Sequence, residues 1–149
     1  MARRFSSATC RGVFFSALLG VLSACAKPPA EEQLHATIDE MQAAATERRP
    51  SEFMDRVTED FIGDDGIDRA ALHNLLRGQL LRNAAVSATR GPVDIERQGD
   101  RATVRFTVML TGGSGGLMPE RAQGYAITSG WRVEDGEWRL FLAEWKPAL

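Results

Sequence analysis

Two side chains of this sequence are suited to proton transfer, and both are expected beside a row of apolar residues. His73 follows Leu72 near the edge of an apolar helical stripe, so its imidazole could serve as a general base near neutral pH. The alternative for His73 is a surface or boundary position without a chemical role. Glu144 is expected on the apolar face of the last predicted strand. A carboxyl group in such surroundings binds its proton more tightly, which suits it to proton abstraction.

The expected place of Glu144 depends on a tight turn predicted at Asp135-Gly136. If Glu134 pairs with Glu137 across this turn, strand alternation brings Glu144 opposite Ile127 on the apolar face. The alternatives are a solvated strand end or a structural carboxylate paired with an arginine. The arginines considered for that pairing are Arg77, Arg82 and Arg105.

Three further side chains, all on predicted strands, are candidates for binding a ligand: Tyr125, Trp131 and Met109. Tyr125 is the only tyrosine in the chain, and its hydroxyl is the candidate hydrogen-bond donor beside a catalytic base. Tyr125 and Trp131 share one face of the predicted strand over residues 122–134, because strand side chains alternate between faces.

No metal or cofactor is expected. The two histidines, His35 and His73, are predicted on separate helices, which is a poor basis for a zinc site. The aspartates between positions 60 and 68 suggest calcium, but aligning Gly66 with the invariant glycine of a calcium loop puts Phe61 and Leu72 at the first and last ligand positions. Turn formation and helix capping explain these aspartates.

The sequence Leu22-Ser23-Ala24-Cys25 ends an apolar run over residues 13–22. This run is too short to span a bilayer, and arginines precede it, which is typical of a secretory signal. The small residues before Cys25 resemble the lipobox of bacterial lipoproteins, which implies cleavage before Cys25 and its lipidation. We therefore expect a lipoprotein signal peptide at 1–24 and a lipidated anchor with a short tether at 25–30. Because Ala26 rather than Asp follows the cysteine, the expected site is the outer membrane of a Gram-negative cell, facing the periplasm.

The charge of the exported chain argues against a nucleic-acid partner. Without Arg3, Arg4 and Arg11, the chain has 15 basic and 20 acidic residues, a net charge of −5. Nucleic-acid binding favours a basic surface. The expected partner is the membrane itself, through the lipid anchor.

The apolar pattern changes from a helical to a strand period near residue 86, which predicts an α+β fold with the helices first. Pro50 ends the first helix, and Ser51 can cap a short second one that carries Phe53, Met54 and Val57. Asp68 is the expected cap of the third. The predicted helices are 31–48, a short one after 51, and 68–83; the predicted strands, forming an antiparallel meander, are 86–97 with a bend at Gly91-Pro92, 101–111, 122–134 and 138–146.

Three local sequences add a family resemblance. They are Asp60-Phe61 followed by Gly63 and Gly66, the run Gly99-Asp100-Arg101-Ala102-Thr103-Val104, and Asp135-Gly136-Glu137-Trp138-Arg139-Leu140. With the order of elements, they resemble the nuclear-transport-factor-2-like (cystatin-like α+β) superfamily over residues 31–149. The resemblance implies a cone-shaped half-barrel, in which three helices pack on a curved antiparallel sheet of about four long strands and leave a pocket at the open end. It implies no particular reaction.

The sequence therefore predicts a membrane-anchored envelope lipoprotein whose domain binds a small apolar ligand or a partner without catalysis. The alternative is a cofactor-independent isomerase or lyase, with Glu144 or His73 as base and Tyr125 as hydrogen-bond donor. A homodimer through the outer face of the sheet, centred on Phe141 and Trp145, is a third expectation.

Overall fold

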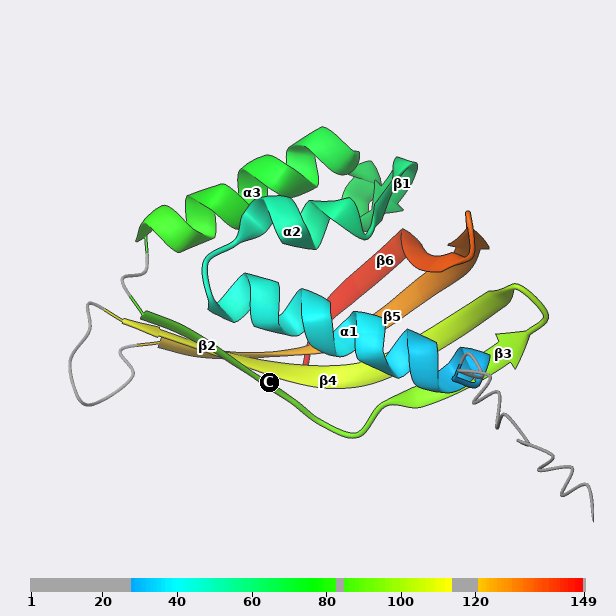
Figure 1. Cartoon of the computed structure of the whole chain (residues 1–149). Coiled ribbons are helices and arrows are strands. Elements are labelled where there is room, and N and C mark those ends of the chain that lie inside the picture. Colours follow the sequence, from blue (N-terminus) through cyan, green and yellow to red (C-terminus); the bar gives the residue numbers. More distant parts are fainter. Residues whose placement is uncertain (1–27, 83–84, 114–120, 149) are drawn as a thin grey trace, which may run out of the picture.

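The computed structural model describes residues 28–82, 85–113 and 121–148. The predicted signal peptide at 1–24, Cys25 and the first residues of the tether lie outside this range. Figure 1 shows the elements. They are α1 (Ala30–Thr46), α2 (Pro50–Asp55), β1 (Val57–Gly63), the short 3-10 helix η1 (Asp64–Gly66), α3 (Arg69–Arg82), β2 (Ala85–Arg90), β3 (Asp94–Gln98), β4 (Arg101–Gly113), β5 (Arg121–Glu134) and β6 (Glu137–Pro147).

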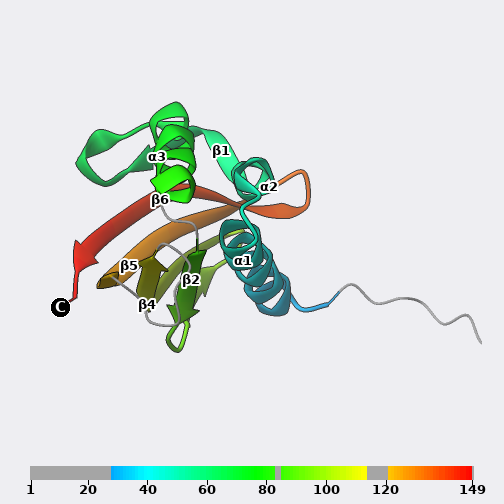
Figure 2. The same cartoon turned by 90° about the vertical axis from the view of Figure 1, so that its left-hand side faces the viewer.

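The strands form one curved, open sheet, and the helices lie over one face of it (Figures 1 and 2). The strand order is β1-β6-β5-β4-β2, with β3 also paired to β4 beside β2. The predicted α+β architecture is confirmed. The sheet is mixed rather than purely antiparallel, because β1 pairs with β6 in the parallel sense.

The helices form largely where the periodicity predicts them. Leu34, Ile38 and Met41 of α1 are buried on one side, at the spacing of a helical face. Asp68 precedes α3, and its Oδ1 accepts a 2.8 Å hydrogen bond from the backbone N–H of Ala71. Such a cap satisfies one of the N–H groups that have no partner within the helix, so α3 starts where the sequence predicts.

Strand β1 was not predicted from the sequence. Val57, assigned above to the second helix, begins this strand, and the second helix ends at Asp55. Val57 and Phe61 are both 2% exposed and belong to the core. The segment becomes a strand because it pairs with β6, about eighty residues further along the chain, and no local pattern contains that pairing.

Strand β6 contains an extra residue that overturns the predicted position of Glu144. The expected register holds from Glu134–Glu137 to Trp131–Leu140, but Gly130 then pairs with Leu142, so Phe141 is a β-bulge. A shift of one residue exchanges the two faces of a strand. Trp145 therefore pairs with Ile127 and faces the helices, whereas Glu144 pairs with Thr128 and is exposed on the convex face.

The bulge also changes the surface expected to form a homodimer. Phe141 lies on the convex face, where the guanidinium carbons of Arg132 and Arg101 lie 5.4 and 5.7 Å from its ring centroid. Trp145 lies on the opposite, concave side and lines a cavity there. The expectation that Phe141 and Trp145 share the outer face is wrong, and dimerisation itself stays a prediction.

The core fills one end of the half-barrel. Leu34 and Val104 are fully buried there, and Trp131 and Trp138 are each 3% exposed. The indole Nε1 of Trp138 donates a 2.8 Å hydrogen bond to the carbonyl of Ala30, which fixes the first turn of α1 to the sheet. This packed end holds the helices over the concave face, and it leaves the other end of the half-barrel for a cavity.

Candidate binding cavity

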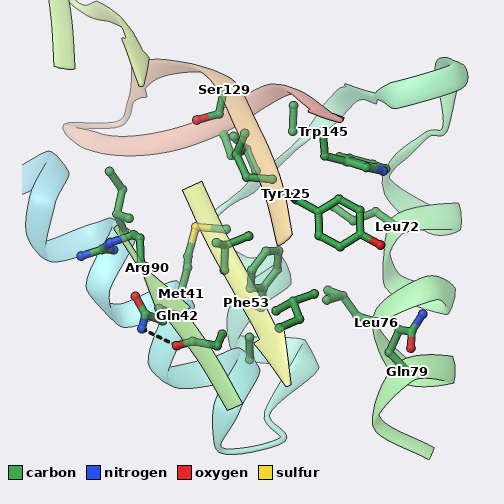
Figure 3. Close-up of a pocket in the computed structure, with 18 of the residues that line it drawn as sticks. Met41, Gln42, Phe53, Leu72, Leu76, Gln79, Arg90, Tyr125, Ser129 and Trp145 are labelled. Atoms are coloured by element: carbon green, nitrogen blue, oxygen red, sulfur yellow. Dashed lines mark hydrogen bonds between the residues drawn. The ribbon is translucent and has the colours of Figure 1, made fainter. Parts of the chain in front are cut away.

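A cavity of about 630 Å³ lies between the helices and the concave face of the sheet (Figure 3). Strand alternation aims every second residue of β4 and β5 into it. The second half of α1, together with α3, supplies the opposite wall. The apolar lining residues are Ile38, Met41, Ala45, Pro50, Phe53, Phe61, Leu72, Leu75, Leu76, Leu80, Ala88, Phe106, Val108, Leu110, Ile127, Trp131, Leu140, Ala143 and Trp145; the polar ones are Gln42, Thr46, Gln79, Arg90, Thr111, Gln123, Tyr125 and Ser129.

Several polar groups of the lining are hydrogen-bonded to the protein itself. The hydroxyl of Ser129 accepts a 2.9 Å hydrogen bond from the Trp131 indole and donates one of 3.2 Å to the carbonyl of Val104. The side-chain amide of Gln42 donates to the carbonyl of Ala88 at 3.0 Å, which ties α1 to β2 (Figure 3). These hydrogen bonds therefore connect the elements of the cavity wall to one another.

Arg90 is the one ionised side chain among the described lining residues. Its Nη2 forms an ion pair with Asp39 of α1, and Figure 3 shows the guanidinium turned toward that helix. Its Nη1 is buried, without a hydrogen-bond partner and without contact with solvent. The hydrocarbon part of Arg90 consequently forms the cavity wall, whereas its charge is directed at Asp39.

The structure brings only some of the predicted site residues together. Two of the binding candidates, Tyr125 and Trp131, line the cavity. Met109 does not, because it falls between Val108 and Leu110 on the strand and so belongs to the convex face. His73 is half-buried on α3 outside the cavity, and Glu144 is exposed on the convex face.

Other lining residues were missed by the sequence analysis. Trp145 was assigned to the wrong face because the bulge at Phe141 is invisible to a strict two-residue alternation. Arg90 and Gln42 were not considered, although Arg90 alternates with Ala88 on a predicted strand. Alternation along β2 was therefore a usable signal for Arg90.

The strongest electrostatic pairing lies outside the cavity, on the convex face. Arg132 donates hydrogen bonds of 2.6 and 3.0 Å to the two carboxylate oxygens of Asp60, and these lower the pKa of Asp60 to about 2. Among the described residues, no three His, Cys, Asp or Glu side chains gather closely enough to hold a metal ion. No helix of the described part is long and apolar enough to cross a membrane.

No family model and no curated protein matches the chain. A Novosphingobium aromaticivorans protein provisionally named a scytalone dehydratase matches in structure with a TM-score of 0.72 at 16% identity, over 80% of this chain and 84% of that one. An NTF2-like protein of unknown function from Pseudomonas putida gives 0.68 at 15% identity, over 78% and 85%. Bd1075 from Bdellovibrio bacteriovorus gives 0.70 at 10% identity over 79% of this chain, which spans 40% of Bd1075.

These similarities define the fold. The chain has the NTF2-like fold, also described as cystatin-like, that its local sequences resemble. At such low identities the likeness extends to the fold alone, so the function has to be argued from the cavity.

Proposed function

We propose that this protein is a lipid-anchored protein of the bacterial envelope whose domain binds a small, largely apolar molecule in the cavity. The observation that supports binding is the cavity itself. Its volume of about 630 Å³ falls within the range of small-molecule sites, about 300–1,000 Å³. Most of its wall is aliphatic or aromatic, so an apolar molecule would leave water on entering it.

The alternative, an isomerase or lyase, has less support. Proton transfer requires an acid or base within hydrogen-bond reach of the substrate. Among the described lining residues there is no Asp, Glu, His, Lys or Cys. Tyr125 is the one side chain among the described lining residues that could act as an acid there, and the lining places no base beside it.

Blocking the cavity tests the binding proposal. N-phenyl-1-naphthylamine, a neutral dye whose emission rises in apolar surroundings, should bind the wild-type protein. Ile127→Trp places an indole in the cavity and should weaken dye binding by about tenfold or more. Ala126→Trp adds the same group at the neighbouring, exposed position of β5 and should leave binding unchanged. Equal dye binding by the two folded variants would contradict the proposal; thermal unfolding checks that both fold.

Removing the lipidated cysteine tests the anchor. Cys25→Ser should move the protein from the membrane fraction to the soluble fraction, since the sulfur that carries the lipid is absent. The wild-type protein should co-sediment with outer-membrane markers in a density gradient, because Ala26 follows the cysteine. Equal membrane retention of the variant would refute lipidation without bearing on the cavity.

A further inference from the structure

The cavity changes in polarity from its closed end to its mouth. At the closed end, Phe61, Leu72 and Trp131 are 2%, 6% and 3% exposed. Toward the mouth, exposure rises along each wall, to Leu110 on β4 at 37% and to the exposed Gln123 on β5. A molecule entering the cavity therefore meets both polar and apolar side chains at the mouth, Gln123 and Leu110 among them, and almost only hydrocarbon at the closed end.

Among the described residues, the closed end offers a ligand no hydrogen-bond donor. The one polar side chain there, Ser129, already accepts from the Trp131 indole and donates to the Val104 carbonyl. A hydroxyl has one hydrogen to donate, and that hydrogen is engaged. A polar group pushed to this depth would lose the water that donates to its oxygen and find no donor in its place, at a considerable cost. The inner part of the ligand must then be hydrocarbon.

The mouth carries neutral hydrogen-bonding groups. The Tyr125 hydroxyl donates a 3.1 Å hydrogen bond to Oε1 of Gln123, which leaves the phenol oxygen able to accept and the Gln123 amide able to donate. Figure 3 shows the Tyr125 hydroxyl turned toward α3, on the side where Gln79 lies. One donor and one acceptor thus stand side by side where the cavity meets water.

Among the described lining residues, no charged side chain is available to pair with a charged ligand. Arg90, the one ionised residue among the described lining side chains, is paired with Asp39, and its unpaired Nη1 has no exposed surface from which to reach a ligand. A carboxylate or ammonium group in the cavity would lose hydration without gaining an ion pair.

Resting on the proposed function, we infer that the ligand is a single-chain amphiphile with an uncharged head group. Its hydrocarbon tail occupies the closed end beside Trp131, and its head, a hydroxyl or an amide, lies at the mouth between Tyr125 and Gln123. Both head groups donate and accept, as the Tyr125–Gln123 pair does.

Displacement of the bound dye by three compounds of equal chain length tests this inference. Decanol should displace the dye more effectively than decanoate or decylammonium at neutral pH. Tyr125→Phe should weaken decanol binding about three- to tenfold, the effect of one neutral hydrogen bond, once the affinity of the same variant for the dye has been measured and used to convert displacement into affinity. Arg90→Met should not alter the order of the three compounds.

The outcomes separate the two proposals. If the dye does not bind the wild-type protein, the proposed function fails. If the dye binds but decanoate competes best, and Arg90→Met removes that advantage, the ligand is an anion and the inference is overturned. Equal competition by all three compounds would overturn it as well, because the head group would then lie outside the site.

Discussion

The contacts of Arg132 extend across three strands of the sheet. It reaches from β5 across β6 to Asp60 on the edge strand β1, and its Nε donates a 2.7 Å hydrogen bond to Glu134. It also lies over the ring of Phe141, the bulged residue. One arginine thus contacts both features that the sequence did not predict, the strand β1 and the bulge in β6. Arg132 pairs with carboxylates on the surface and does not line the cavity, so its role is to hold the strands together rather than to bind a ligand.

The pairing of Asp60 with Arg132 predicts a dependence of stability on pH. The hydrogen bonds lower the pKa of Asp60 from 3.8 to about 2 in the folded protein. Because the folded pKa is the lower one, the pair stabilises the fold above pH ~4 and loses this effect as the pH falls toward ~2. Urea unfolding followed over this window should show a steeper loss of stability for wild type than for Asp60→Asn.

Asp94→Asn is the control for this measurement, since Asp94 makes a single 3.5 Å contact with Arg105 on the same convex side. It should keep the wild-type profile. Identical profiles for wild type and Asp60→Asn would mean that the pair with Arg132 does not form in solution.

At the scale of elements, sequence patterns predicted the features that depend on residues close together in the chain. The apolar face of α1 and the Asp68 cap of α3 each depend on residues only a few positions apart, and both were found as predicted. The register next to the Asp135-Gly136 turn was also correct, because that turn fixes it. Strand β1 could not be predicted in the same way, since its partner β6 is remote in sequence.

The bulge escaped prediction because it coincides with a close contact between two strands, β5 and β6. Gly130 has no side chain, and the Phe141 ring occupies the space beside it: a Cβ at position 130 would lie 2.9 Å from Cζ of Phe141 and 3.1 Å from Cβ of Leu142. Nothing in the alternation of β6 indicates this contact. The fold was therefore predictable from periodicity, whereas the identity of the β6 lining residues beyond the bulge, Ala143 and Trp145, was not.

Gly130→Ala tests whether this close approach holds the bulge. The added methyl group should destabilise the protein by about 1–3 kcal/mol, the usual effect of overpacking. Phe141→Leu removes the atom nearest to that methyl group, so the double variant should recover part of the loss in urea unfolding. An unchanged stability for Gly130→Ala alone would show that the ring moves aside freely.

At the scale of the whole molecule, the half-barrel has a filled end and a hollow end. The first turn of α1 belongs to the filled end, where Trp138 bonds to Ala30. The cavity is lined only by the later part of the helix, from Ile38 to Thr46. A helix of 17 residues is about 25 Å long, so the first turn of α1 and the mouth lie at opposite ends of the domain (Figure 1).

Together with the proposed lipid anchor, this arrangement predicts the orientation of the domain on a membrane. Ala30 is the fifth residue after Cys25, a reach of at most ~17 Å, so the proposed lipid on Cys25 would keep the first turn of α1 near the bilayer and turn the mouth away from it. A fluorophore attached to Glu31→Cys should transfer energy to labelled lipid head groups more efficiently than one on Leu81→Cys, at the exposed end of α3. Stronger transfer from position 81 would mean that the cavity opens onto its own membrane. The expected result means instead that its ligand arrives through the aqueous compartment.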